Sequence, residues 1–278
     1  MSMKPQTLLD LLRTLSAVDC DSLGVEVAKQ LGPFVDCTSN QAIAHHELSK
    51  TDAGGKLINY QLIMDSIAYS KSKTSEFYDV HLREVATNPK DSFNTQKTVS
   101  NARRFVAISK DLDPNFDITK LCIKIPATWE GIQACKELQS QGIATLATAI
   151  SSMQQTMLAS HVGCTYIGLY INELRVHFDE SYVDDNKSFH IYDLSQRFYQ
   201  KHGQRTQVIT ASLISIDEVM ILAGADHITI APSLLRELSK TPTDSWKGAV
   251  GSVFQPVSSE AQDVGGAVSS HVRQAIHF

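Results

Sequence analysis

One lysine in this sequence stands where a charged side chain is rarely found. Lys124 lies inside the apolar run Leu121–Pro126, which has the length and composition of a buried strand. An ammonium group among hydrocarbon side chains must find a partner, reach solvent or lose its proton. Two interpretations stay open: a structural lysine that is ion-paired or extends to solvent, and a lysine whose amine, deprotonated by desolvation, forms a Schiff base with a carbonyl compound.

Polar side chains occur at the ends of other apolar runs, where they could assist such an amine. Imine formation removes water and moves protons in both directions, so carboxylates and hydroxyls nearby are the groups that it needs. Each of these side chains, taken alone, could instead cap a turn or the following helix. The candidates are Asp19, Asp21, Asn40, Glu84 and Thr148.

The elements that would position these side chains repeat along the chain. About eight β-branched, apolar runs alternate with stretches of helical periodicity, and near-continuous apolar character is typical of parallel strands covered on both faces. The expected strands are Ala17–Asp21, Phe34–Thr38, Val80–Val85, Leu121–Pro126, Ala144–Ile150, Thr165–Ile171, Gln207–Ser212 and His227–Ala231. Eight such units predict an α/β fold, a (β/α)₈ TIM barrel, in which functional side chains lie at the carboxyl ends of strands.

We expect residues 1–278 to form this one barrel domain, because no composition change marks a linker. Thr7–Leu15 reads as a helix before the first strand, and Ala267–His277 as a helical extension after the last unit. Helices over Trp129–Gln141, Ile191–His202 and Ile216–Ala223 are each followed by a glycine, the residue that most often ends a helix.

Composition excludes several classes of protein. The chain is 42% hydrophobic and 20% charged, with 25 basic and 30 acidic residues, so we expect a folded protein and no nucleic-acid partner. No apolar stretch approaches the roughly 18 residues of a membrane span, and the leucine-rich start is unlike a signal peptide, which favours the cytoplasm. Five cysteines without a C-x-x-C pair predict neither disulfides nor zinc. We expect no cofactor and no metal, with a homodimer left open.

Three stretches resemble the transaldolase family. Residues 123–132, IKIPATWEGI, resemble its Schiff-base signature, K-[IL]-x-[AS]-T-x-x-G in essentials. Residues 36–41, DCTSNQ, are similar to the family's D-A-T-T-N-P element, and residues 222–235, LAGADHITIAPSLL, to its last-strand segment. The stretches follow one another in the family's order between about Ser16 and about Ser239. The resemblance implies a class I, metal-independent transaldolase barrel of carbohydrate metabolism, as in the pentose phosphate pathway.

The resemblance also implies roles for individual residues. Lys124 would form the imine, and Glu84 and Thr148 would move protons through a bound water. Asn40 would hold a hydroxyl of the dihydroxyacetone unit, while Tyr170 and Ser212 would contact the substrate. Asp21 would take the proton from the C4 hydroxyl during carbon–carbon cleavage, with Asp19 as the competing assignment.

The chain departs from the family where phosphate is expected to bind. In place of the family's S-P-F-x-G-R it has GLYINE over residues 168–173, so that Gly168 lacks the hydroxyl and Glu173 replaces a cation. Ile214 stands where a second arginine would be. A carboxylate repels a phosphate dianion, so we expect poor use of sugar phosphates unless Arg175 takes over.

Three functions fit these features. The first is a transaldolase-like enzyme acting on a small-molecule sugar or ketone through a lysine Schiff base. The second is a specialised aldolase of a biosynthetic pathway with an unphosphorylated substrate. Tyr170 suggests plain aldol cleavage or addition, because related fructose-6-phosphate aldolases carry an active-site tyrosine. The third is a catalytically silent barrel that binds a metabolite or a protein, and the joint presence of the candidate residues speaks against it.

Overall fold

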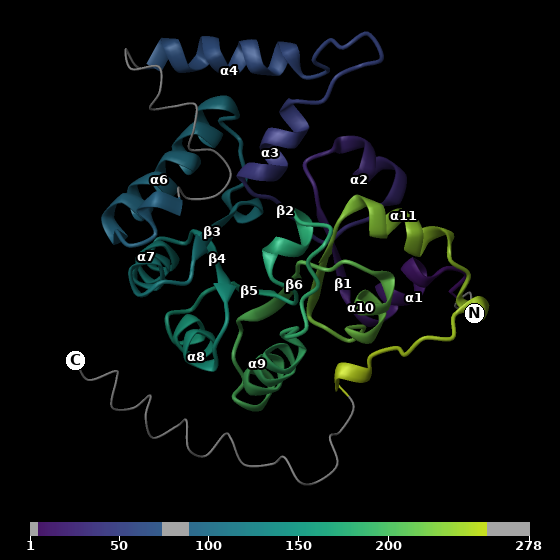
Figure 1. The fold of residues 1–278 in the computed structure, drawn as a ribbon. Helices are drawn as coiled ribbons and strands as arrows, with labels where there is room; N and C mark the ends of the chain where they lie inside the picture. The colour runs from purple at the N-terminus through teal and green to yellow at the C-terminus, as the bar shows by residue number, and fades with distance from the viewer. Residues whose placement is uncertain (1–4, 74–88, 255–278) are drawn as a thin grey trace.

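Seven parallel strands form a curled half-barrel with helices between them (Figure 1). The computed structural model describes residues 5–73 and 89–254. The strand order in the sheet is β2-β1-β7-β6-β5-β4-β3. The strands are β1 (Ala17–Asp21), β2 (Cys37–Thr38), β3 (Cys122–Pro126), β4 (Ala144–Ile150), β5 (Tyr166–Tyr170), β6 (Gln207–Ala211) and β7 (His227–Ile230).

This architecture confirms the predicted α/β barrel class and seven of its strands. β1 and β4 have the predicted bounds, whereas β2 is shorter than the predicted Phe34–Thr38. The predicted strand Val80–Val85 and the predicted helix Ala267–His277 lie outside the described residues. Within the described part of the chain, β2 and β3 are the two edges of the sheet.

Helices follow most strands and cover the outer side of the sheet (Figure 1). None of those in the described ranges is long and apolar enough to cross a membrane. The helices are α1 (Leu8–Leu15), α2 (Val25–Leu31), α3 (Gln41–Leu48), α4 (Tyr60–Lys73), α6 (Thr95–Leu112), α7 (Trp129–Ser140), α8 (Met153–His161), α9 (Phe189–Lys201), α10 (Ile216–Ile221) and α11 (Pro232–Lys240).

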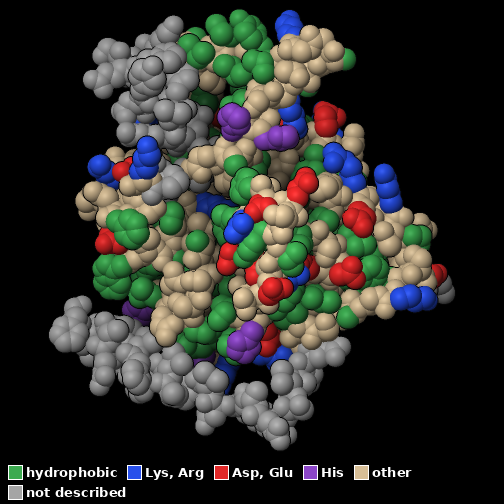
Figure 2. Space-filling model, in the orientation of Figure 1, with side chains coloured by type: hydrophobic (Ala, Val, Ile, Leu, Met, Phe, Trp, Pro, Cys, Tyr) green, Lys and Arg blue, Asp and Glu red, His purple; other side chains and the backbone are tan. Residues whose placement is uncertain are grey.

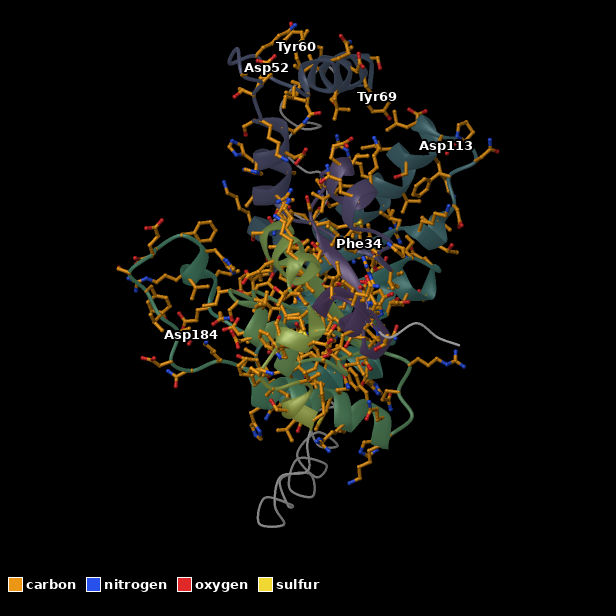
Figure 3. All side chains as sticks on the ribbon, turned by 90° about the vertical axis from the view of Figure 1, so that its right-hand side faces the viewer. Phe34, Asp52, Tyr60, Tyr69, Asp113 and Asp184 are labelled. Carbon is orange, nitrogen blue, oxygen red and sulfur yellow. The ribbon has the colours of Figure 1, made fainter. Side chains whose placement is uncertain are left out.

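α4 stands apart from the barrel body, at the top of Figure 1, and Tyr60 and Tyr69 mark it in Figure 3. It is tied to α6 by the Tyr69 hydroxyl, which donates to Asp111 Oδ2 at 2.7 Å. α6 in turn packs on α7 beside β3, so this pair of helices lies next to the strand that carries Lys124.

A tight turn between β3 and α7 fixes the end of that strand. The Thr128 side chain caps α7 by accepting a hydrogen bond from the Gly131 amide at 2.9 Å. A Cβ atom on Gly131 would lie 2.0 Å from the carbonyl oxygen of Pro126, so the backbones approach in a way that only glycine permits. The threonine and the glycine of the K-x-x-A-T-x-x-G element therefore have a structural role that positions Lys124.

Replacing this glycine should destabilise the protein although alanine is the better helix former. Gly131→Ala is expected to lower the free energy of unfolding by about 1–3 kcal/mol, because the added methyl group overlaps the Pro126 carbonyl. Urea denaturation measures the change. Lys136→Ala, on the exposed side of the same helix, is the control and should stay within about 0.5 kcal/mol of the wild type. A Gly131→Ala variant at least as stable as the wild type would contradict this account of the turn.

Candidate active site

Lys124 faces the inside of the curled sheet. Its strand neighbours Ile123 and Ile125 are buried in the core, and Ile125 would contact a side chain on Gly131 of α7, so alternation turns Lys124 to the opposite face. There it lines a cavity of about 530 Å³ whose walls come from residues 36–39 and 120–124 and from α4 and α6. Lys124 is partly buried, as its place in an apolar run predicted.

An aromatic ring and a hydroxyl lie beside this lysine. The Nζ atom of Lys124 is 5.8 Å from the ring centroid of Tyr170, at the end of β5, which is a cation–π distance. Thr148, on β4, donates from Oγ1 to the Tyr170 hydroxyl at 3.2 Å. The structure therefore brings together three of the residues that the sequence singled out.

Gly168 has a packing role beside these side chains. A Cβ atom on Gly168 would come within 3.2 Å of both Thr148 Oγ1 and Leu146 Cδ2. The glycine thus leaves room for the Thr148 side chain, and a serine at this position would require Thr148 and Leu146 to shift slightly.

The two aspartates of β1 have different surroundings. Asp21 is partly exposed at the carboxyl end of the strand, where its Oδ1 accepts a hydrogen bond from Thr38 Oγ1 at 2.7 Å. Asp19 is fully buried, with its Oδ2 2.9 Å from Nδ1 of His227 on β7. The rings of Tyr166 and His227 pack in a T-shaped arrangement, with 5.2 Å between their centroids. Asp19 is therefore hydrogen-bonded to a histidine. Asp21 lies nearer to the mouth of the half-barrel, which is its end at the carboxyl ends of the strands.

Burial shifts the ionisation of this pair. Desolvation raises the pKa of Asp19 above its ordinary value, despite the hydrogen bond from His227. Burial alone would lower the pKa of His227, but the hydrogen bond and negative charge of Asp19, with smaller contributions from Asp36 and Asp226, outweigh it and raise that pKa. Both shifts favour the protonated forms, so the pair retains a proton well buried below Asp21.

Asn40 and Ser212, two predicted substrate contacts, have partners within the protein. Asn40 caps α3, because its Oδ1 accepts a hydrogen bond from the Ile43 amide at 3.0 Å. This is the alternative role, capping of the following helix, that the sequence left open for this residue. Ser212 has the left-handed φ of 62° and lies 2.8 Å through Oγ from Nε2 of His177. Glu84 lies outside the described residues.

The loop between β5 and α9 lies near the mouth of the half-barrel, and Asp184 in Figure 3 shows how far it projects. Acidic side chains with a few basic ones gather at the centre of the face in Figure 2, where Figure 1 shows this loop. Glu173 Oε2 accepts from the Tyr182 hydroxyl at 2.9 Å. Arg175 forms an ion pair with Asp179 at 2.7 Å and stacks over Tyr182, 4.5 Å from the ring centroid. The arginine that could have replaced a phosphate contact thus has a carboxylate partner.

A buried glutamate within the expected helix Ile216–Ala223 organises the loop between β6 and α10. Glu218 is 4% exposed and accepts from Lys187 Nζ at 2.7 Å, from Asn172 Nδ2 at 2.9 Å and from the Ile214 amide at 2.9 Å. Asn172 also donates to the Ser212 carbonyl at 2.8 Å. These bonds hold the backbone around Ser212, and no spacing in the sequence links the residues that make them.

The described residues contain no cluster of side chains suited to bind a metal ion. Across 5–73 and 89–254, no three or more His, Cys, Asp or Glu side chains are grouped so that they could hold an ion. His45 and His46 are exposed on α3.

The curled parallel sheet with helices between its strands, and with Lys124 facing inward, defines an α/β protein of the barrel class. A family model described as transaldolase/fructose-6-phosphate aldolase matches residues 18–274, and the chain belongs to this family. It is 28% identical to a transaldolase of Alteromonas mediterranea, over 84% of this chain and 79% of the relative. It is 27% identical to transaldolase A of Pasteurella multocida, over 91% and 87% respectively. Family membership supports an enzyme of the aldolase or transaldolase type.

The buried Asp19–His227 pair should make stability depend on pH. Because the pKa of His227 is raised in the folded state, this proton stabilises the fold fully below the unfolded pKa of about 6.5, and the contribution is lost as pH rises through the folded pKa. Urea denaturation between about pH 6 and about pH 9 should show this loss in the wild type and a smaller one in His227→Gln.

His46→Gln, which removes an exposed histidine from α3, is the control and should follow the wild-type curve. A His227→Gln curve parallel to that of the wild type would mean that Asp19 does not hold a proton on this histidine.

Proposed function

We propose that this protein makes or breaks a carbon–carbon bond of a ketose or other carbonyl compound through a Schiff base on Lys124. The observation that carries the proposal is the position of this lysine, on an apolar strand and in the wall of a cavity of about 530 Å³. A partly desolvated amine that opens onto a cavity is suited to attack a carbonyl carbon. The family to which the chain belongs supports this chemistry.

The side chains around Lys124 match the steps that the reaction needs. The amine adds to the carbonyl, and the adduct loses water to give an iminium ion, with protons moved by acid–base groups. We assign one of these proton exchanges to Thr148, a role that its hydrogen bond to Tyr170 supports. Glu84 remains the proposed second group.

Cleavage then requires a base at the substrate's C4 hydroxyl. When the base removes this proton, the C3–C4 bond breaks, its electrons move to the iminium nitrogen, and an aldehyde and an enamine on Lys124 result. We assign the base to Asp21, which is partly exposed at the strand end, rather than to the fully buried Asp19. The enamine attacks a second aldehyde in a transaldolase, or takes a proton and is hydrolysed in an aldolase.

The mouth favours a substrate without a phosphate group. Glu173 and the exposed Ile214 offer no positive charge, and Arg175 is already paired with Asp179. Placing a phosphate dianion there would cost free energy through repulsion by the carboxylate. Aldol cleavage or addition of a neutral carbonyl compound is the second candidate, supported by Tyr170 beside Lys124.

Borohydride should trap the imine on Lys124. Incubation with a panel of ketoses and ketones followed by reduction is expected to add the donor mass to the peptide that contains Lys124. Lys124→Met should give no adduct, whereas Lys120→Met, which alters another lysine of the same cavity, should still be labelled. Full activity in Lys124→Met, or no adduct with any donor, would refute the mechanism.

Arginines at the mouth should restore phosphate recognition. The Glu173→Arg/Ile214→Arg variant is expected to lower KM for fructose 6-phosphate by at least about tenfold, since charge-assisted bonds contribute roughly 1.5–3 kcal/mol each. A smaller effect on kcat is expected, because these contacts act alike in ground and transition states.

Glu180→Arg, an exposed charge reversal in the same loop, controls for net charge and should change KM little. If the wild type already converts fructose 6-phosphate with a kcat/KM of roughly 10⁴ M⁻¹s⁻¹ or more, another cation binds the phosphate and the substrate proposal fails.

A further inference from the structure

Two threonine hydroxyls connect the proposed base to a neighbouring strand. Thr38 Oγ1 on β2 is 2.7 Å from Asp21 Oδ1 and 2.5 Å from Thr229 Oγ1 on β7. β1 lies between β2 and β7 in the sheet, and the pairing of Asp21 with Thr38 puts both side chains at the same level. Thr38 is 8% and Thr229 is 4% exposed, so water has little access to compete for these hydrogen bonds.

The direction of both hydrogen bonds follows from proton counting. An ionised carboxylate only accepts, and a threonine hydroxyl has one proton to donate. Thr38 must therefore donate to Asp21, which leaves its oxygen as the acceptor from Thr229. The two hydrogen bonds therefore form a chain in which Thr229 donates to Thr38 and Thr38 donates to Asp21.

We infer that Thr38 and Thr229 are positioning residues for Asp21: their aligned hydroxyls fix Oδ1 and so turn Oδ2 toward the substrate hydroxyl. The inference rests on the proposed function, in which Asp21 removes the C4 proton. In that step the proton moves from the substrate hydroxyl to Oδ2, and the electrons of the broken O–H bond form the aldehyde. Oδ1 then becomes the carbonyl oxygen of a carboxylic acid, which still accepts from Thr38. The hydroxyl chain therefore persists in both protonation states of the base.

A comparison with Asp19, the other aspartate of β1, shows what the Thr229–Thr38 hydrogen bonds contribute to Asp21. Asp19 is bound through Oδ2 to His227, and in the described part of the chain its Oδ1 has no hydrogen-bond partner although it is buried. Asp21 has a neutral hydroxyl partner instead, which orients the carboxylate without supplying a positive charge to neutralise it. The hydrogen-bond partners thus give different environments to two carboxylates that lie two residues apart on one strand.

Loss of the Thr38 hydroxyl should slow cleavage and spare imine formation. Thr38→Val keeps the shape of the side chain and is expected to lower kcat roughly 10–100-fold, the range for a hydrogen bond to a charged group, with little change in KM. Borohydride trapping on Lys124 should remain at the wild-type level. Thr38→Ser keeps the hydroxyl and should restore most of the activity.

The second hydroxyl acts through the first, so Thr229→Val should lower kcat by a smaller factor, about two- to fivefold. Thr210→Val is the matched control, because this threonine is buried on the adjacent β6 and its hydroxyl has no partner within the described residues. It should leave trapping and turnover unchanged.

A double-mutant cycle separates positioning from a general loss of structure. With Asp21→Asn in place, Thr38→Val should cause no further loss of turnover, whereas structural damage would add to it. The inference is overturned if Thr38→Val matches Thr38→Ser in kcat, if trapping and turnover fall together, or if the two losses add. Failure of wild-type Lys124 to form any adduct would instead overturn the proposed function, and this inference with it.

Discussion

A charge inside a barrel costs several kcal/mol unless a partner compensates it, and the inner face of this sheet nevertheless carries Asp19, Lys124 and His227. Each is reached by another polar or aromatic group from a different strand. Asp19 meets His227 across β1 and β7, and Lys124 lies near Tyr170 across β3 and β5. Satisfying these side chains therefore fixes strand register as well as chemistry, because a slip of one residue would turn each of them into the apolar layer beneath the helices.

The apolar outer faces of the same strands make this arrangement possible. Ile123 and Ile125 on β3, like Ile228 and Ile230 on β7, are at most 2% exposed and pack in the core. Their burial supplies the free energy that offsets the cost of the polar interior. The close approach of Gly131 to Pro126 then sets where β3 ends, and so how far Lys124 lies below the mouth.

The sequence predicted the strands well because buried parallel strands are continuous apolar runs, and Lys124 stood out by interrupting one. It left Asp19 as a competitor to Asp21, because side chains two residues apart share a face and only the partners on β2 and β7 distinguish them. Nothing in the sequence distinguishes Thr38 and Thr229, because β-branched residues are common in strands. The contacts of Glu218 with Asn172 and Lys187 could not be predicted for another reason, since these residues come from three separate segments that only the fold brings together.

Residues on the strands and residues on the loops at the mouth differ in how freely they can be substituted. A strand side chain such as Thr38 is hydrogen-bonded to neighbours on both sides, so a substitution there also affects Asp21, the proposed base. Glu173 and Ile214 lie on loops at the mouth, and neither is the proposed imine-forming lysine or the proposed base. Replacing cations there changes which substrates are repelled and leaves the inward-facing groups in place. Under the proposed function, the loops at the mouth can therefore vary while Lys124 and Asp21 stay in place, provided that the loop backbone remains anchored, as the buried Glu218 anchors the Ile214 amide here.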